Sequence, residues 1–482
     1  MHSRFGYSPR TKHILMAKPK LRGKDLVKLG FEEGPAVSLA LEVIKRHYKY
    51  HSHQEKLDVL AAVADHPENY VEDEHFAKVV GMLIPQKEAV AKRVQLSPKA
   101  LPYQVYGAAN IEKGAQDQMH IAMRLPIAKA GALMPDAHQG YGLPIGGVLA
   151  TENAIIPYAV GMDIGCRMCL SVYDMPPQKM DKDRSRFKKA LENHSRFGQK
   201  VFDKPLDDEV LHHPLFKEIQ LVKKLKYKAQ QQIGTSGSGN HFVEFGQVSI
   251  SQYDDHLQLP AGEYLALLSH SGSRGLGANI AQHYTEVARS IRKLPKEAKH
   301  LAWLDMDSEA GIEYWLAMNL AGDYASACHH HIHKRMGQFL GQEPIKMVEN
   351  HHNFAWKEKV NGEELIVHRK GATPAGKNVL GIIPGSMTAP AFIVKGKGVE
   401  QAIYSAAHGA GRKMSRTKAK HSITHAAWQK HLAEAGVDLI GGALDEAPFA
   451  YKDIHEVMYQ QQDLVETLGT FQPKVVRMDR SR

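Results

Sequence analysis

An Asp–Cys pair between glycines, Asp163 and Cys166 in the segment Gly-Met-Asp-Ile-Gly-Cys, is the feature that most constrains this chain. Glycines on both sides let the backbone turn tightly and present the carboxylate and the thiol in one direction. A carboxylate and a thiolate held in this way form a corner of a metal site. A lone cysteine is more often a small buried apolar residue, but a glycine turn is a poor place for plain packing.

Histidines recur in turns rich in Gly, Ser and Asn on either side of this pair. His138 lies upstream in a Pro-Asp-Ala-His turn that also carries Asp136, and His241, His270 and His352 lie downstream. Any one of these histidines alone would more often be structural. A carboxylate, a thiolate and several imidazoles together suit divalent transition metals, and one thiolate can bridge two ions.

The composition limits the class of protein. The chain has 482 residues, of which 43% are hydrophobic and 24% charged, as in ordinary globular proteins. It has no apolar run long enough to span a membrane, no apolar signal core at its start, and too few cysteines for a disulfide framework. We therefore expect a reducing, cytoplasmic setting. The net charge of +10 favours an anionic partner such as nucleic acid, although a merely basic enzyme remains an open alternative.

Periodicity predicts one large mixed α/β (α+β) domain over 101–482, with central mixed or antiparallel sheets flanked by helices. A basic, helical extension is predicted over 1–100. Helical spacing is found over 35–48, 57–64, 76–83, 184–193, 215–232, 278–294, 309–340 and 457–468. Short apolar runs predict strands over 145–150, 154–160, 167–172, 241–246, 264–269, 364–368, 379–383 and 391–395.

The segment His-Gly-Ala-Gly-Arg, from His408 to Arg412, has the features of a phosphate site. Its glycines allow the backbone to approach a phosphate closely, and Arg412 offers a guanidinium fork for phosphate oxygens. His408 itself is either a structural group or a nucleophile. Basic turns lie near the motif histidines in the sequence and contain Arg274, Arg369, Lys370 and Arg416. Each alone is usually a solvated surface, but together they would suit phosphate capture from two RNA ends.

Two further patterns look like metal motifs, and we interpret both conservatively. Cys166 and Cys169 form a Cys-x-x-Cys, but the chain has no second such pair, and Cys169 should alternate onto the other face of its strand. His329 and His333 are spaced four residues apart on a predicted helix, and we interpret them as part of a polar helix face.

The order of these motifs, from about Met134 to Tyr451, resembles that of the tRNA-splicing ligase RtcB family. The resemblance implies an RtcB-like catalytic domain that holds two Mn²⁺ ions. It places Cys166 as the bridging ligand and divides the other four ligands between the ions: Asp163 and His241 on one, His270 and His352 on the other. His351 is expected to point elsewhere.

The resemblance also implies that His408 attacks the α-phosphate of GTP and becomes guanylylated. The remaining nucleotide contacts that it suggests are Asn240, Glu244, Ser386, Gly409, Ala410, Gly411, Arg412 and Tyr451. The implied activity is a GTP- and Mn²⁺-dependent RNA ligase of splicing or repair, which joins 2′,3′-cyclic phosphate or 3′-phosphate ends to 5′-hydroxyl ends. A metal-dependent phosphoesterase acting on nucleic acid without nucleotide activation is the alternative, and a catalytically silent RNA-binding subunit is disfavoured by the full ligand set.

Four positions depart from the pattern of the resembled family. Ala391 stands where a serine contacts guanine, and Asp479 stands near a position usually held by lysine. Arg167 replaces a glycine after the metal cysteine, and Gln139 follows the Pro-Asp-x-His turn. We therefore expect GTP to be preferred over ATP by a smaller margin than the family pattern implies.

Overall fold

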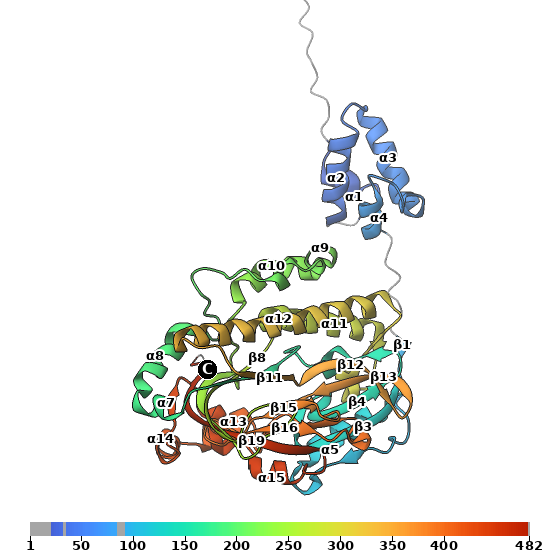
Figure 1. Cartoon of the computed structure of the whole chain (residues 1–482). Coiled ribbons are helices and arrows are strands. Elements are labelled where there is room, and N and C mark those ends of the chain that lie inside the picture. The colour runs from blue at the N-terminus through green and yellow to red at the C-terminus, as the bar shows by residue number, and fades with distance from the viewer. Residues whose placement is uncertain (1–20, 32–34, 84–91, 481–482) are drawn as a thin grey trace, which may run out of the picture. The chain divides into compact units, whose positions relative to one another are not determined.

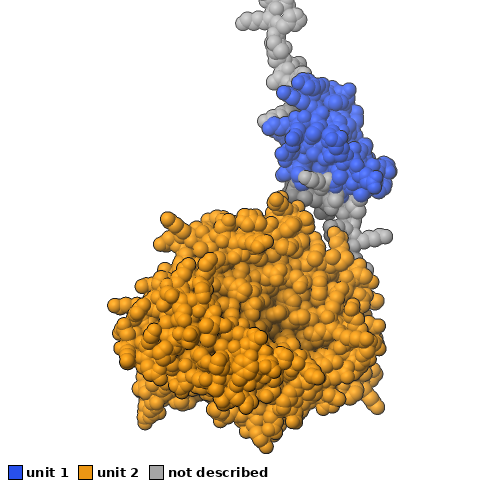
Figure 2. Space-filling view, in the orientation of Figure 1, with its two compact units in different colours: residues 1–91 blue, residues 92–482 orange. Residues whose placement is uncertain are grey.

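The computed structural model describes residues 21–31, 35–83 and 92–480. The chain forms two compact units, residues 1–91 and 92–482, which are coloured separately in Figure 2. Residues 92–100, which the sequence analysis placed in the extension, group with the second unit. Among the described residues, no helix combines the length and the apolar character needed to cross a membrane.

The described part of the first unit is helical and has an apolar core of its own. Ser52 begins its third helix with a capping box, in which the Ser52 hydroxyl accepts from the Glu55 amide and the Glu55 carboxylate accepts from the Ser52 amide. Val37 and Ile44, from the predicted apolar stripe, are buried in the core together with Leu60. The helices are α1 (Gly23–Val27), α2 (Pro35–His47), α3 (His53–Asp65) and α4 (Ala77–Leu83).

The main sheet of the second unit has eight strands in the order β11-β6-β8-β7-β19-β16-β15, with β18 beside β19. The strands are β6 (Arg167–Tyr173), β7 (Phe242–Ile250), β8 (Gly262–Ser271), β11 (Lys346–His351), β15 (Leu380–Ile383), β16 (Ala391–Gly396), β18 (Asp438–Ile440) and β19 (Val465–Met478). Its two end strands meet, because the Asn350 side chain of β11 accepts from the Ile382 amide of β15 at 2.8 Å. The sheet therefore curves until it is nearly closed.

A second sheet has the strand order β12-β13-β4-β3-β2. Its strands are β2 (Gln104–Val105), β3 (Ala128–Tyr141), β4 (Leu143–Thr151), β12 (Asn353–Val360) and β13 (Glu363–Lys370). Three two-stranded pairs complete the β-structure of the described residues: β1 (Lys92–Arg93) with β9 (Arg292–Lys293), β5 (Ala154–Ile155) with β10 (Leu304–Asp305), and β14 (Ala372–Pro374) with β17 (Ser405–Ala407).

Helices cover the outer face of the main sheet, where α12 packs on β6 and β8, α11 on α12, and α10 on α11 (Figure 1). Ser308 caps α12, which runs its full predicted length until Gly341 ends it at a φ of +68°. The helices of this unit are α5 (Lys113–Ala122), α6 (Pro157–Val160), α7 (Gln178–Lys182), α8 (Arg184–His194), α9 (Leu215–Glu218), α10 (Gln220–Gln232), α11 (Arg274–Ile291), α12 (Glu309–Leu340), α13 (Arg416–Ser422), α14 (His425–Glu434) and α15 (Ile454–Tyr459).

Strand β6 is buried on both faces, and its alternate residues therefore enter two different cores. Met168 and Leu170 pack inside the curved sheet with Leu268 of β8. Tyr173 points outward and packs in a core shared with Ile332 of α12. This alternation separates the two Cys/His clusters described below.

Two predicted elements are wrong. The strand predicted over 154–160 ends at Ile155, because Pro157 begins the short helix α6. The helix predicted over 457–468 ends at Tyr459, and the chain then enters β19, a central strand of the main sheet. Helical spacing in a short window was overridden there by pairing with β7 and β16.

Candidate active site

Four neighbouring strands bring four of the predicted metal ligands to one end of the main sheet. His352 directly follows β11, Cys166 directly precedes β6, His270 lies near the end of β8, and His241 directly precedes β7. Adjacent strands are antiparallel, so the end of one lies beside the start of the next. The segments that the sequence indicated as histidine turns are thus the ends of paired strands.

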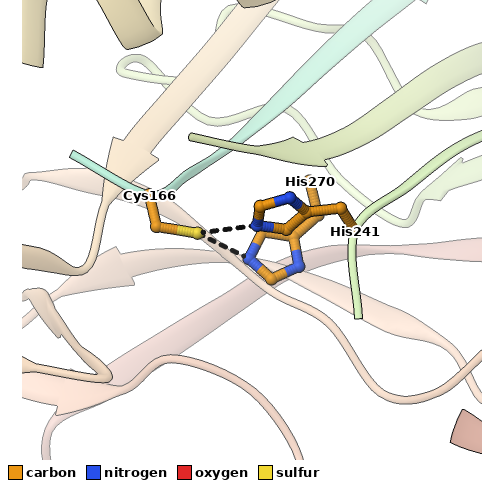
Figure 3. A group of neighbouring side chains, drawn as sticks. All are labelled: Cys166, His241 and His270. Atoms are coloured by element: carbon orange, nitrogen blue, oxygen red, sulfur yellow. Dashed lines mark hydrogen bonds between the residues drawn. The ribbon is translucent and has the colours of Figure 1, made fainter. Parts of the chain in front are cut away.

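The ligand atoms converge around the thiol of Cys166. Its Sγ lies 3.4 Å from Nε2 of His241 and 3.1 Å from Nε2 of His270 (Figure 3). A carboxylate oxygen of Asp163 lies 3.0 Å from Nε2 of His241, and Nε2 of His352 lies 3.3 Å from that of His270. The thiol therefore stands between two pairs of ligands, Asp163 with His241 and His270 with His352.

Burial shifts the pKa values of the Cys166 thiol and of two of the histidines toward their uncharged forms. It raises the pKa of the Cys166 thiol well above its usual value, with the Asp163 carboxylate adding to the shift. It lowers the pKa of His270 to about 3 and that of His352 well below its usual value, so both imidazoles are neutral. Neutral imidazoles can coordinate a metal directly, and a coordinated thiol gives up its proton. The donor set fits divalent transition metals.

This cluster forms part of the wall of a cavity of about 710 Å³. Every residue that the resemblance suggested for nucleotide binding lines this cavity: Asn240, Glu244, Ser386, Gly409, Ala410, Gly411, Arg412 and Tyr451. His408, Lys370 and Arg416 line it as well. The structure thus brings the metal cluster, the glycine turn and two of the predicted basic residues together around one space.

His408 follows β17, and the buried carboxylate of Asp136 holds it in place. No role was predicted for Asp136 from the sequence. Nδ1 of His408 lies 2.6 Å from Oδ2 of Asp136, and the His408 backbone amide donates to the same oxygen at 3.2 Å. The His408 ring lies 5.0 Å from that of His352, measured between ring centres. Asp136 therefore engages Nδ1 and not Nε2 of this ring. The only sequence signal for Asp136 was its place in the Pro-Asp-Ala-His segment.

Glu244 is a buried acid on the cavity wall. Burial raises the pKa of Glu244 well above its usual value, because it disfavours the charged carboxylate. Donors brought by a ligand would favour the ionised form instead. Proton loss from Glu244 should therefore accompany the binding of any ligand that donates hydrogen bonds to it.

The two arginines of the glycine-turn region engage acidic neighbours. Nη2 of Arg412 donates to the carbonyl oxygen of Asp445 at 2.6 Å, and Nη1 lies 3.3 Å from the Glu446 carboxylate. Arg416 pairs with the Asp445 carboxylate at 2.9 Å and also with Glu446. The Tyr451 hydroxyl donates to Glu446 as well. The fork of Arg412 is thus occupied by protein acceptors in this state.

The four predicted RNA-phosphate residues do not share one location. Lys370 lines the cavity and donates to the carbonyl oxygen of Tyr141 at 2.7 Å, and burial lowers its pKa to about 7. The prediction for Arg369 is wrong, because its fully buried guanidinium forms two 2.7 Å bonds to the Glu358 carboxylate. Arg274 is not among the residues that line this cavity, and its Nε donates to the Thr235 hydroxyl at 3.1 Å.

Of the positions that depart from the family pattern, some line the cavity and others lie away from it. Ala391 is packed in the core of the main sheet, away from the cavity wall. Arg167 points away from the cavity, since Nη2 donates to the carbonyl oxygen of Gly322 in α12. Gln139 and Met478, the neighbour of Asp479, line the cavity. The loss of a serine at position 391 therefore gives no direct reason for weaker guanine selection.

His329 and His333 lie on one face of α12 and make polar contacts, but that face is buried and not solvated. Their exposed fractions are 0% and 2%, because this face of α12 packs on the outer face of β6 and β8. Cys169 lies beside them, on the face of β6 opposite to Cys166, as its alternation predicted. His351 lies off the cavity wall and stacks on Trp356, with 5.0 Å between ring centres.

Comparison with known proteins gives the family. The family model described as "tRNA-splicing ligase RtcB" matches residues 118–220 and 207–479. The chain belongs to the RtcB family. The RNA-splicing ligase RtcB of Escherichia coli (strain K12) is 34% identical over 398 residues, which cover 76% of this chain and 94% of that protein.

Two further relatives show the same family likeness. The tRNA-splicing ligase RtcB of Nanoarchaeum equitans is 31% identical over 78% of this chain and 95% of its own length. The RNA-splicing ligase RtcB homolog 1 of Entamoeba dispar is 29% identical over 70% of this chain and 76% of its own length. The family match begins at residue 118, after the helical first unit.

Proposed function

We propose that this RtcB-family chain is an RNA ligase that joins a 3′-phosphate or 2′,3′-cyclic phosphate end to a 5′-hydroxyl end, using GTP and Mn²⁺. Its relatives in Escherichia coli and Nanoarchaeum equitans are named RNA-splicing and tRNA-splicing ligases. The observation that carries the proposal is the Asp136–His408 pair beside the Cys166 cluster. A histidine oriented by a buried carboxylate has the arrangement of an activated nucleophile.

The ligand geometry supports a pair of Mn²⁺ ions in this proposal. Cys166 would bridge them, with Asp163 and His241 on one ion and His270 and His352 on the other, as the contacts already group these side chains. Bound there, the ions would neutralise charge on the triphosphate and on the leaving pyrophosphate. Manganese is carried over from the family, since affinity order alone does not favour it.

The proposed chemistry begins at Nε2 of His408. This nitrogen attacks the α-phosphorus of GTP, so that an N–P bond forms and the bond to pyrophosphate breaks. Asp136 holds Nδ1–H and stabilises the positive charge that develops on the ring. An oxygen of the RNA 3′-phosphate then attacks the phosphorus of the bound GMP, and the N–P bond to His408 breaks. Finally the 5′-hydroxyl attacks the RNA phosphorus, and GMP leaves. A cyclic phosphate must first be opened by water.

Guanine selection would be the role of Glu244. Guanine offers N1–H and N2–H₂ donors that adenine lacks, and the Glu244 carboxylate can accept from both. A buried acceptor left without its donors discriminates strongly against the wrong base. Asn240 would bond the phosphoryl group, and Lys370 would face RNA phosphate from the cavity wall.

Mass analysis of the intact protein after incubation with GTP and Mn²⁺ tests the proposal. The wild type should gain the mass of one GMP, and His408→Ala should gain none while keeping its metal. An adduct on His408→Ala would exclude this residue as the nucleophile. Cleavage of RNA phosphoesters without any adduct would favour the phosphoesterase alternative, for which the Asp136–His408 pair has no evident purpose.

A further inference from the structure

A second cluster of metal-binding side chains lies on the outer face of β6 and β8, apart from the cavity. Cys169 of β6 and His329 and His333 of α12 have ligand atoms that all lie within 4.8 Å of one another. Their exposed fractions are 0%, 0% and 2%. None of the three is among the residues that line the cavity. The two histidines are four residues apart, so they project from the same face of the helix toward the strand.

Two serines of the sheet orient the histidine rings. Oγ of Ser269, the register partner of Cys169, lies 2.6 Å from Nδ1 of His329 and 2.7 Å from Nε2 of His333. Oγ of Ser171 lies 2.7 Å from the other ring nitrogen of His333. Ser171 thus fixes the ring from behind and leaves Nε2 directed at Ser269. This is the arrangement in which an outer hydrogen bond orients a metal-binding histidine.

The cluster is costly as a plain apolar core. Burial lowers the pKa of His333 to about 3 and that of His329 well below its usual value, so both rings are neutral. Burying polar side chains costs free energy, and each of these residues could be apolar if packing were its only role.

We propose that Cys169, His329 and His333 bind one zinc ion. A thiolate and two imidazoles are ligands that zinc prefers, and the ligand atoms of these three side chains already lie within 4.8 Å of one another. Binding would displace the thiol proton of Cys169 to solvent and form one Zn–S and two Zn–N bonds. All three side chains are buried, so the ion would be shielded from solvent. The ion would fasten α12 to the strands that carry the ligands of the active site.

This site is independent of the proposed ligase chemistry, and the chain offers a clean way to isolate it. The chain has three cysteines, Cys166, Cys169 and Cys328, all buried and free. In the full-length variant Cys166→Ala/Cys328→Ala, Cys169 is the sole thiol. Co²⁺ serves as the probe, because it accepts the same ligands as zinc and its bond to a thiolate absorbs light. Folding is checked by circular dichroism.

The double variant should show a thiolate-to-Co²⁺ absorption band that is lost on adding one equivalent of zinc. Adding Cys169→Ala should abolish the band. A folded double variant without the band, or a band that survives Cys169→Ala, would overturn the proposal.

A second measurement keeps all cysteines in place, in case the double variant does not fold. His333→Gln is compared with His330→Gln, which alters a neighbouring, exposed histidine that contacts Glu349. Purified with zinc, His333→Gln should hold one equivalent less than the wild type, and His330→Gln the same amount as the wild type. Equal zinc contents in the two variants would contradict the site.

Discussion

The two Cys/His clusters lie on opposite faces of one sheet, and both involve residues on or next to β6 and β8. Cys166 and His270 face the cavity, whereas Cys169 and Ser269 face α12. The two cysteines are three residues apart, and an odd separation on a strand sends side chains to opposite faces. One Cys-x-x-Cys segment therefore contributes to two separate sites. A sequence motif of this kind does not by itself mean that both thiols bind one ion.

The surroundings of the two clusters explain why we assign them different roles. Asp163 stands beside the cavity cluster and Asp136 behind His408, and the cavity leaves room for a substrate. The outer cluster is bounded by the hydroxyls of Ser171 and Ser269 and has no opening to this cavity. An open coordination position permits catalysis, whereas a closed set of ligands gives stability.

The largest effect should come from removing the thiol on the cavity side. Cys166→Ala should abolish GMP-adduct formation and RNA joining and weaken Mn²⁺ binding by more than about 100-fold. Cys169→Ala, which changes the same kind of buried thiol on the other face, should still form the adduct once folded. Adduct yield and bound Mn²⁺ are measured for both. Equal loss of adduct in two folded variants would show that the faces are not separate sites.

Asp136→Asn should produce the next largest effect, and it acts on the cavity side alone. An amide keeps the shape of the carboxylate but cannot stabilise a positively charged ring, so adduct formation should slow by on the order of 10²–10⁴-fold. Metal content and thermal stability should stay near the wild-type values. Rapid-quench kinetics with labelled GTP measures the rate. A rate within a few-fold of wild type would remove Asp136 as the residue that positions His408.

Zinc should stabilise the fold through the outer cluster. In the Cys166→Ala background, free zinc at about 100 times its Kd should raise the free energy of unfolding by about 2.7 kcal/mol. The same zinc should give no such gain when Cys169→Ala is added. Thermal melts of the two proteins with zinc and with a chelator measure the difference. An equal gain in both would place the stabilising ion elsewhere.

The smallest effect concerns pH and nucleotide choice. Burial raises the pKa of Glu244, and in the proposed mode guanine binds its ionised form, so proton release would accompany binding. GTP affinity should therefore fall as pH falls below that pKa, by up to about tenfold per pH unit. ATP affinity should lack this component.

Two variants, Glu244→Gln on the cavity side and Cys169→Ala on the outer face, test whether this pH dependence belongs to the cavity. Glu244→Gln should remove it and reduce the preference for GTP by about tenfold, a loss of about 1.4 kcal/mol. Cys169→Ala should leave both properties as in the wild type. Titration of labelled GTP and ATP over a range of pH values measures this. A GTP preference that is unchanged in Glu244→Gln would mean that another group reads the base.

Much of the fold could be predicted from sequence because its signals are local. The glycines around Asp163 and Cys166 indicated a tight turn, and the helical spacing over 309–340 predicted the full length of α12. Closely spaced residues report on such features because backbone geometry and helix capping act over a few residues. The helix predicted over 457–468 was wrong for the opposite reason, because pairing with the distant strands β7 and β16 decided the conformation of β19.

The sequence by itself determined which residue types were available for metal and phosphate chemistry, and it gave the order in which they occur. Only the tertiary structure decided their partners. Arg369 pairs with Glu358 across the β12–β13 pair, so it is not available to bind RNA phosphate. Asp136 lies 272 positions from His408 in the sequence, yet its carboxylate contacts the His408 ring. The physical reason is that the state of a charged or ligating side chain depends on burial and on atoms a few ångströms away. Those atoms come from strands far apart in the chain, as the positions of Cys169, His329 and His333 also illustrate.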